Sequence, residues 1–156
     1  VKGYKHFANK LWNIARFILA NANEQEIDSK TWPSGPERYQ FLAREHELLE
    51  QCDALTKDVT TDIEEYRVYM AAEKLYHYAW HELADNIIEE SKPLLAGTHA
   101  SAKASRARLL VILLDRTVRL LHPFMPFITE EIYQSLPTKD AEFLMVATWP
   151  SPDGLE

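Results

Sequence analysis

Residues 3–20 read GYKHFANKLWNIARFILA, and the spacing of the apolar side chains in this stretch decides the fold class. Successive side chains of an α-helix are rotated by about 100°, so residues three and four apart share a face. The apolar residues recur at that spacing, which predicts a helix from about Gly3 to Ala20 with one stripe facing a core. The stripe consists of Tyr4, Phe7, Leu11, Ile14, Ala15 and Ile18.

Helical spacing continues beyond this stretch. Pro36 suits the first position of a second helix, which we expect to run to about Lys57. Thr61 and Glu64 are spaced as a capping box, which predicts that a long third helix begins there. The same helix is expected to end at Lys92-Pro93, because proline cannot donate the backbone hydrogen bond that a helix needs.

The last third of the chain predicts two further helices. One runs from about Ala102 to Leu121, and a short one follows Pro126 and stops before Pro137. The tail from Phe143 to Trp149 is apolar and is expected to be extended and to pack across the bundle. The sequence therefore predicts an all-α fold, an up-down bundle of about five helices with a short extended C-terminal tail, over residues 1–156 as one domain.

Length and composition narrow the class of protein. The 156 residues are enough to bury a real core. No apolar run is long enough to span a bilayer, and no secretory leader is recognisable. The single cysteine, Cys52, excludes an internal disulfide framework and fits a reducing compartment, which predicts a cytoplasmic location. The chain starts at Val1 inside a predicted helix, so we interpret it as a piece excised from a longer protein.

The first helix is basic, although the chain carries a net charge of −7. Residues 2–23 contain four positive side chains and no carboxylate, with four aromatic residues interleaved. A local basic surface on an acidic protein is typical of polyanion binding. Rings beside positive charges are what a protein needs to hold unstacked bases of single-stranded nucleic acid. These residues are Lys2, Lys5, Lys10 and Arg16 with Tyr4, Phe7, Trp12 and Phe17.

A second stripe of this helix, roughly 100° from the apolar one, is polar and contains His6, Lys10, Asn13 and Phe17. Lys10 can donate to a base or a phosphate, and Asn13 can both donate and accept. Phe17 is out of phase with the core, so its ring either stacks on a base or is covered by a neighbouring helix. Arg16 either contacts phosphate or caps carbonyls at the helix end.

The predicted fourth helix is also basic. Residues 98–123 hold five Lys or Arg side chains against one carboxylate. Its arginines could follow an RNA backbone, or they could pair with acids of neighbouring helices. The residues concerned are Arg106, Arg108, Arg116 and Arg119.

We expect no metal, cofactor or catalytic residue in this chain. His77 and His81 are four residues apart, with Asp85 one turn further, but the chain lacks the His-Glu-x-x-His and Glu-x-x-His patterns of metal sites. It also lacks a glycine-rich phosphate loop and a Gly-x-Ser-x-Gly turn. A protein-binding helical module and a metal-binding bundle are the alternative interpretations.

Several motifs resemble the anticodon-binding domain of valyl-tRNA synthetases, which are class I enzymes. The opening motif is Asn9-Lys10-Leu11-Trp12-Asn13 followed by Arg16-Phe17. A later motif, HPFMPFITEEIY at residues 122–133, is shared with the leucine, isoleucine and methionine enzymes. Further matches in order and spacing are Trp80, Asp85, Glu89, Lys92-Pro93 and Trp149-Pro150, whereas Leu83-Ala84 stands where the family has Phe-Cys. The resemblance covers essentially the whole chain.

The resemblance implies a domain that binds the anticodon loop and stem of a valine-accepting tRNA and positions it for aminoacylation. Lys10 and Phe17 match family positions that contact the anticodon, and Asn13, Arg16 and His6 are the further candidates. The class I catalytic signatures are absent. The resemblance therefore implies that ATP with magnesium, adenylate formation and editing belong to other domains of a longer chain. The same domain of an isoleucine or leucine synthetase is the nearest alternative.

Overall fold

The computed structural model describes residues 2–32 and 41–151, and over these ranges the protein is an all-α bundle without β-strands. The elements in chain order are α1 (Lys2–Glu24), α2 (Ala43–Glu64), α3 (Val68–His77), η2 (Tyr78–Ile88), α4 (Glu89–Leu95), α5 (Ala100–Leu121), α6 (Pro126–Gln134) and the short η3 (Leu144–Val146). The segments α3, η2 and α4 are continuous and form one long rod. The predicted all-α bundle is confirmed.

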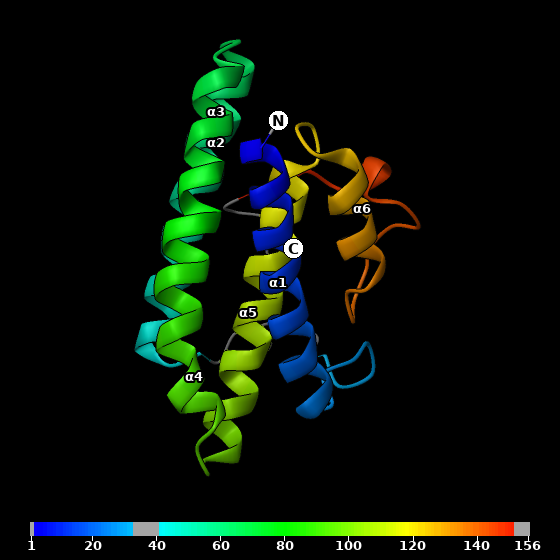
Figure 1. Cartoon of the computed structure of the whole chain (residues 1–156). Coiled ribbons are helices and arrows are strands. Elements are labelled where there is room, and N and C mark those ends of the chain that lie inside the picture. Colours follow the sequence, from blue (N-terminus) through cyan, green and yellow to red (C-terminus); the bar gives the residue numbers. More distant parts are fainter. Residues whose placement is uncertain (1, 33–40, 152–156) are drawn as a thin grey trace.

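Helices α1 and α5 run side by side in opposite directions through the middle of the bundle (Figure 1). The α3–α4 rod and α2 lie on one side of this pair, and α6 lies on the other. Along its length α1 packs against α5, η2 and α6, so one face is buried and the other is open. None of the helices in the described ranges is long and apolar enough to cross a membrane.

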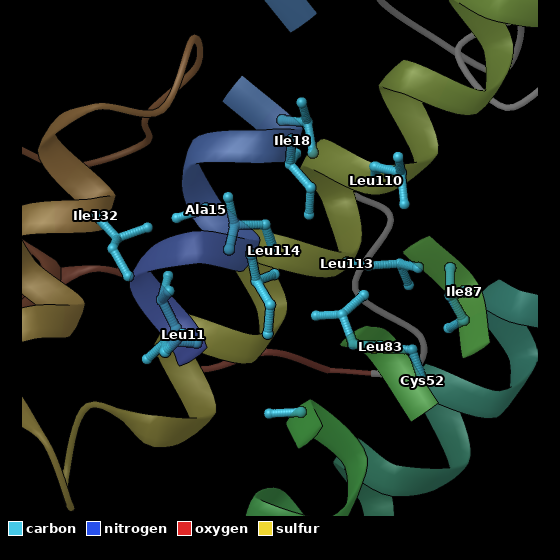
Figure 2. Close-up of a cluster of buried hydrophobic side chains, with 14 of the residues drawn as sticks. Leu11, Ala15, Ile18, Cys52, Leu83, Ile87, Leu110, Leu113, Leu114 and Ile132 are labelled. Carbon is cyan, nitrogen blue, oxygen red and sulfur yellow. The ribbon is translucent and has the colours of Figure 1, made fainter. Parts of the chain in front are cut away.

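The centre of the core is built from apolar side chains of five elements (Figure 2). Each fully buried aliphatic side chain stabilises the fold by about 1.5–3 kcal/mol relative to an exposed one. The contributors include Leu11, Ala15 and Ile18 of α1, Cys52 of α2, Leu83 and Ile87 of η2, Leu110, Leu113 and Leu114 of α5, and Ile132 of α6.

The predicted apolar stripe of α1 is buried from Phe7 to Ile18, as expected from its helical phase. The prediction is wrong for Tyr4, whose side chain is 55% exposed. The first turn of α1 lies at the rim of an open apolar cavity, where Tyr69 also contributes to the wall, so no helix covers Tyr4 completely.

The junction between the second and third helices was predicted too early. Helix α2 runs past Lys57 to Glu64, so Thr61 and Glu64 lie in its last turn and cap no helix start. The Thr61 hydroxyl donates to the carbonyl of Lys57, 3.0 Å away, which lets threonine stay inside a helix. The chain turns at Tyr66, where φ is 60°. The proposed start at Pro36 lies outside the described residues.

An ion cluster fixes this turn. Asp62 is buried, accepts a hydrogen bond from Arg67 at 2.7 Å and forms an ion pair with Lys74 at 2.6 Å, so it joins the end of α2 to α3. Lys74 and Arg67 together hold the pKa of Asp62 below its usual range. The position of the turn therefore depends on a charge cluster and not on a capping box.

The third helix also continues beyond its predicted end. Pro93 lies inside α4, which ends at Leu95. A proline removes one backbone donor, but only two helical residues follow it here. The N–H groups of Ala96 and Gly97 then bond to the carbonyls of Lys92 and Leu94, which closes the helix.

The C-terminal tail packs across the bundle, as predicted, and it contacts α2 there. Trp149 donates from Nε1 to the Thr60 hydroxyl at 2.9 Å, and Arg119 donates to the carbonyl of Thr148 at 3.0 Å. The tail is extended at Phe143 and Ala147, but the 3₁₀ turn η3 interrupts it between them.

Candidate nucleic-acid interface

The polar stripe of α1 comprises His6, Lys10, Asn13 and Phe17, and Lys10 lies at the edge where α1 meets η2. His6 and Asn13 are exposed, whereas Lys10 and Phe17 are half-buried. The first turn of α1 contains no acidic residue. The stripe thus presents polar and aromatic groups beside each other, next to the buried apolar stripe that anchors the helix.

Lys10 is the only member of the stripe for which the structure describes an ion pair. Its Nζ lies 3.0 Å from Asp85 Oδ1 on η2 and 5.2 Å from the centre of the Trp80 ring. A cation over an aromatic face is attracted by the ring quadrupole. The Lys10 ammonium is therefore held between a carboxylate and an indole.

Trp80 belongs to a group of three rings at the same edge. Phe7 and Tyr76 have ring centres 4.8 Å apart, and Tyr76 and Trp80 have centres 5.7 Å apart with planes inclined by 28°. Phe7 and Tyr76 also line an open apolar cavity of about 770 Å³ between α1, α3 and the corner after α5. This aromatic surface begins beside Lys10 and continues into the cavity.

Phe17 lies at the border of the core. Its ring packs partly against buried side chains and stays partly accessible. Its backbone carbonyl accepts from Asn21 Nδ2 at 2.9 Å, which is a bond within α1. Both interpretations of Phe17 are compatible with this position, because a neighbour covers part of the ring and another part is open.

Arg16 and Asn13 are exposed on the outer side of α1. Among the described residues, Arg16 makes no hydrogen bond or ion pair, so capping of the helix end by this side chain is not observed there. An exposed guanidinium without an acidic partner is available to an external anion.

The arginines of α5 differ from those of α1. Arg106 is buried and donates to Glu45 at 2.9 Å and to Ser91 at 3.0 Å, while Arg116 is buried against Asp53. Arg119 donates to Asp115 at 2.9 Å and also to the carboxylate of Asp140 at 2.8 Å. Of the two alternatives for these three arginines, pairing with acids is the one that the structure supports.

Arg108 is the exception among the four. Its side chain is half-buried, and its Nε has no hydrogen-bond partner in the part of the chain that the structure describes. Its role as a contact for an RNA backbone stays a prediction.

His77, the last residue of α3, and His81 of η2 lie next to each other. The rings of His77 and His81 are 5.0 Å apart, and His81 Nδ1 lies 3.6 Å from Asp85 Oδ2. Within the described ranges no three His, Cys, Asp or Glu side chains gather as metal ligands. Cys52 is fully buried, and burial raises the pKa of its thiol, so it is not poised as a nucleophile.

Sequence reasoning missed the role of Trp80 and Asp85 at this edge. Both matched the resembling family in order and spacing, but neither had an assigned contact. On an ordinary α-helix five residues correspond to a rotation of roughly 140°, which places them on different faces. The segment Tyr78–Ile88 has π-type hydrogen bonding, in which residue i and residue i+5 lie about one turn apart. The π-type hydrogen bonding of this segment could not be predicted from its residue types.

Comparison with known proteins agrees with the fold. A family model described as the anticodon-binding domain of tRNA ligase matches residues 45–156. The valine–tRNA ligase of Bdellovibrio bacteriovorus is 37% identical over 139 residues, which is 89% of this chain and 16% of that protein. The enzyme of Clostridium perfringens is 35% identical over 153 residues, covering 98% of this chain and 17% of that protein.

The fold and these matches define a helical domain for tRNA recognition. The chain belongs to the family of anticodon-binding domains of tRNA ligases, and it is homologous to this domain of valine–tRNA ligases. The alternative of an isoleucine or leucine enzyme is not favoured, because the relatives above are valine–tRNA ligases. The chain spans 16–17% of the length of these curated relatives.

Proposed function

We propose that this chain reads the anticodon of a valine-accepting tRNA within a longer, ATP-dependent valine–tRNA ligase. The observation that carries the proposal is the polar stripe of α1, where Lys10 is held beside Trp80 while Asn13 and Phe17 face outward or stay partly open. The bases of an anticodon loop can be splayed out of their stack and bound by rings and by hydrogen bonds to their edges. This surface offers both kinds of contact.

We assign a proposed role to each residue of the stripe and to the neighbouring Arg16. The accessible part of the Phe17 ring stacks on a base, and Lys10 and Asn13 bond to base edges. Arg16 binds a backbone phosphate as an unpaired exposed cation. His6 lies one turn before Lys10 and extends the same surface toward the first turn of the helix.

The remaining chemistry belongs to other parts of the longer ligase. ATP with magnesium and valine would be used there to form the aminoacyl-adenylate, and an editing domain of the same chain would check the product. This domain contributes the identity and placement of the tRNA. We propose that the ligase acts in the cytoplasm, which fits a domain with a single, buried cysteine.

The experiment is a comparison of two reactions of the full-length ligase carrying Phe17→Ala. Loss of a base–aromatic stack costs about 1–3 kcal/mol, which lowers kcat/KM for tRNA roughly fivefold to more than a hundredfold. Adenylate formation without tRNA should stay unchanged, because this domain does not carry that chemistry. Leu11→Ala is the matched control, since Leu11 is fully buried one turn and a half earlier on the same helix.

A fall in stability like that of Leu11→Ala, together with intact charging of tRNA per folded molecule, would show that Phe17 is a core residue. The proposal would then lose its stacking contact.

A further inference from the structure

A carboxylate lies on the surface that we propose for RNA binding. The Asp85 side chain is 47% exposed and the Lys10 side chain 32% exposed, so the pair is open to solvent at the edge between α1 and η2. RNA is a polyanion, and an uncompensated carboxylate at its binding surface weakens association by repulsion. A carboxylate at this position would oppose RNA binding unless it had a further role there.

The further role follows from the geometry around the Lys10 ammonium. The π-type hydrogen bonding of η2 brings Trp80 and Asp85, five residues apart, toward the same side of the rod. Lys10 Nζ then meets Asp85 Oδ1 at 3.0 Å and the Trp80 ring at 5.2 Å. A flexible four-carbon side chain is thus held at two points that belong to one short segment of η2.

We propose that Asp85 is a positioning residue, which aims the Lys10 ammonium at the edge of a tRNA base; this inference rests on the proposed function. An ammonium group has three N–H donors. One is used by Asp85 and one side faces Trp80, so a donor is left in a fixed direction. The ion pair also offsets the charge of Lys10, which favours a directed hydrogen bond to a base over general attraction to phosphate.

The same carboxylate can also act as a hydrogen-bond acceptor for a base. Asp85 Oδ2 lies 3.6 Å from His81 Nδ1, beyond ordinary hydrogen-bonding distance, and can accept from a base N–H. A lysine donor beside an aspartate acceptor matches a base edge that carries an acceptor next to an amino or imino group. Positioning by Asp85 therefore adds to base discrimination and not only to affinity.

Removal of the charge of Asp85 gives opposite results under the two interpretations. If Asp85 only repels RNA, Asp85→Asn strengthens tRNA binding. If Asp85 aims Lys10, the same substitution weakens binding, because the ammonium loses its fixed direction. The matched control is Glu89→Gln, one turn further along the rod, since Glu89 is an exposed carboxylate that pairs with Lys92 and not with α1.

The experiment measures charging kinetics of the full-length ligase carrying Asp85→Asn, Glu89→Gln, Lys10→Met or Lys10→Met with Asp85→Asn. We expect Asp85→Asn to lower kcat/KM for tRNA by about two- to fivefold, the range of partly exposed ion pairs, with adenylate formation unchanged. Glu89→Gln should leave kcat/KM unchanged or raise it. The double substitution should be no worse than Lys10→Met alone, because Asp85 acts through Lys10.

The proposal is overturned if Asp85→Asn increases kcat/KM for tRNA. It is also overturned if the fold-loss of the double variant equals the product of the fold-losses of the two single variants. A loss caused by Lys10→Met without any effect of Asp85→Asn contradicts the positioning role and leaves the proposed function standing. If Lys10→Met itself has no effect, both the positioning role and the assignment of Lys10 to the anticodon surface are wrong.

Discussion

Helices α1 and α5 are both basic, yet they use their cations in opposite ways. On α5, Arg106 and Arg116 are buried against carboxylates of α2, and Arg119 is held by Asp115 and Asp140. On α1, Arg16 is exposed without a described partner, and Lys10 is held at the surface. The comparison teaches that a basic stretch of sequence leaves cations available to an external anion only where the neighbouring helices do not supply acidic partners for them.

The largest effect is expected at the buried pair of α5. Arg106→Ala leaves the carboxylate of Glu45, 1% exposed, without its main partner, and breaking such a pair costs about 3–5 kcal/mol. Denaturant unfolding of the chain measures the loss. Arg44→Ala is the control, because Arg44 is 45% exposed and its pairs should contribute at most about 1 kcal/mol. Equal losses in the two variants would mean that the α5 arginine is not structural.

The next largest effect is a difference in stability between substitutions on the buried face and on the exposed face of α1. Leu11→Ala removes a fully buried side chain and should lower the free energy of unfolding by about 2–5 kcal/mol. Asn13→Ala changes an exposed side chain and should stay within about 0.5 kcal/mol of the parent chain. Thermal or urea unfolding of both variants checks this. A large loss in Asn13→Ala would place the polar stripe in the core and remove it from the interface.

A smaller, pH-dependent effect is expected where Arg119 meets the tail. Hydrogen bonds from Arg119 lower the pKa of Asp140 to about 2, below the ordinary value of 3.8. The stabilisation is therefore present above about pH 4 and is lost as the pH falls toward 2. Asp140 is 45% exposed, so solvent screening limits the contribution to about 1 kcal/mol. Unfolding of Asp140→Asn and the parent chain at pH 6 and pH 3 should show a difference that shrinks in acid.

A difference between the two proteins that stays constant over this pH range would contradict the role of Asp140 as an ion-pair partner. Burial raises the pKa of Asp115, the other partner of Arg119, so its titration acts in the opposite direction.

Much of the fold could be predicted because it depends on local periodicity. The apolar spacing of α1 and α5 identified both helices, and Pro126 marked the start of α6. The wrong helix boundaries lie where a contact between residues distant in the sequence determines the position of a turn. Asp62 draws Arg67 and Lys74 together and moves the turn past Thr61, and no local pattern contains that information.

The candidate site could be predicted only in part for the same reason. The helical phase separated the polar stripe from the core, and resemblance pointed to Lys10 and Phe17. The partner of Lys10 is Asp85, 75 residues away, and it reaches Lys10 only after the bundle has formed. The partners of Arg106 and Arg116 likewise depend on which acids of α2 pack against α5, for example Glu45, 61 residues from Arg106.

The most direct test of the comparison is the salt dependence of tRNA binding by the full-length ligase with one cation removed from each helix. Arg16→Gln and Arg108→Gln each remove one charge for which no partner is described. We place the main RNA surface on α1, so Arg16→Gln should reduce the slope of log affinity against log salt by about 1. A similar reduction in Arg108→Gln would show that Arg108 also contacts the RNA backbone. An unchanged slope in Arg16→Gln with a reduced slope in Arg108→Gln would contradict the account.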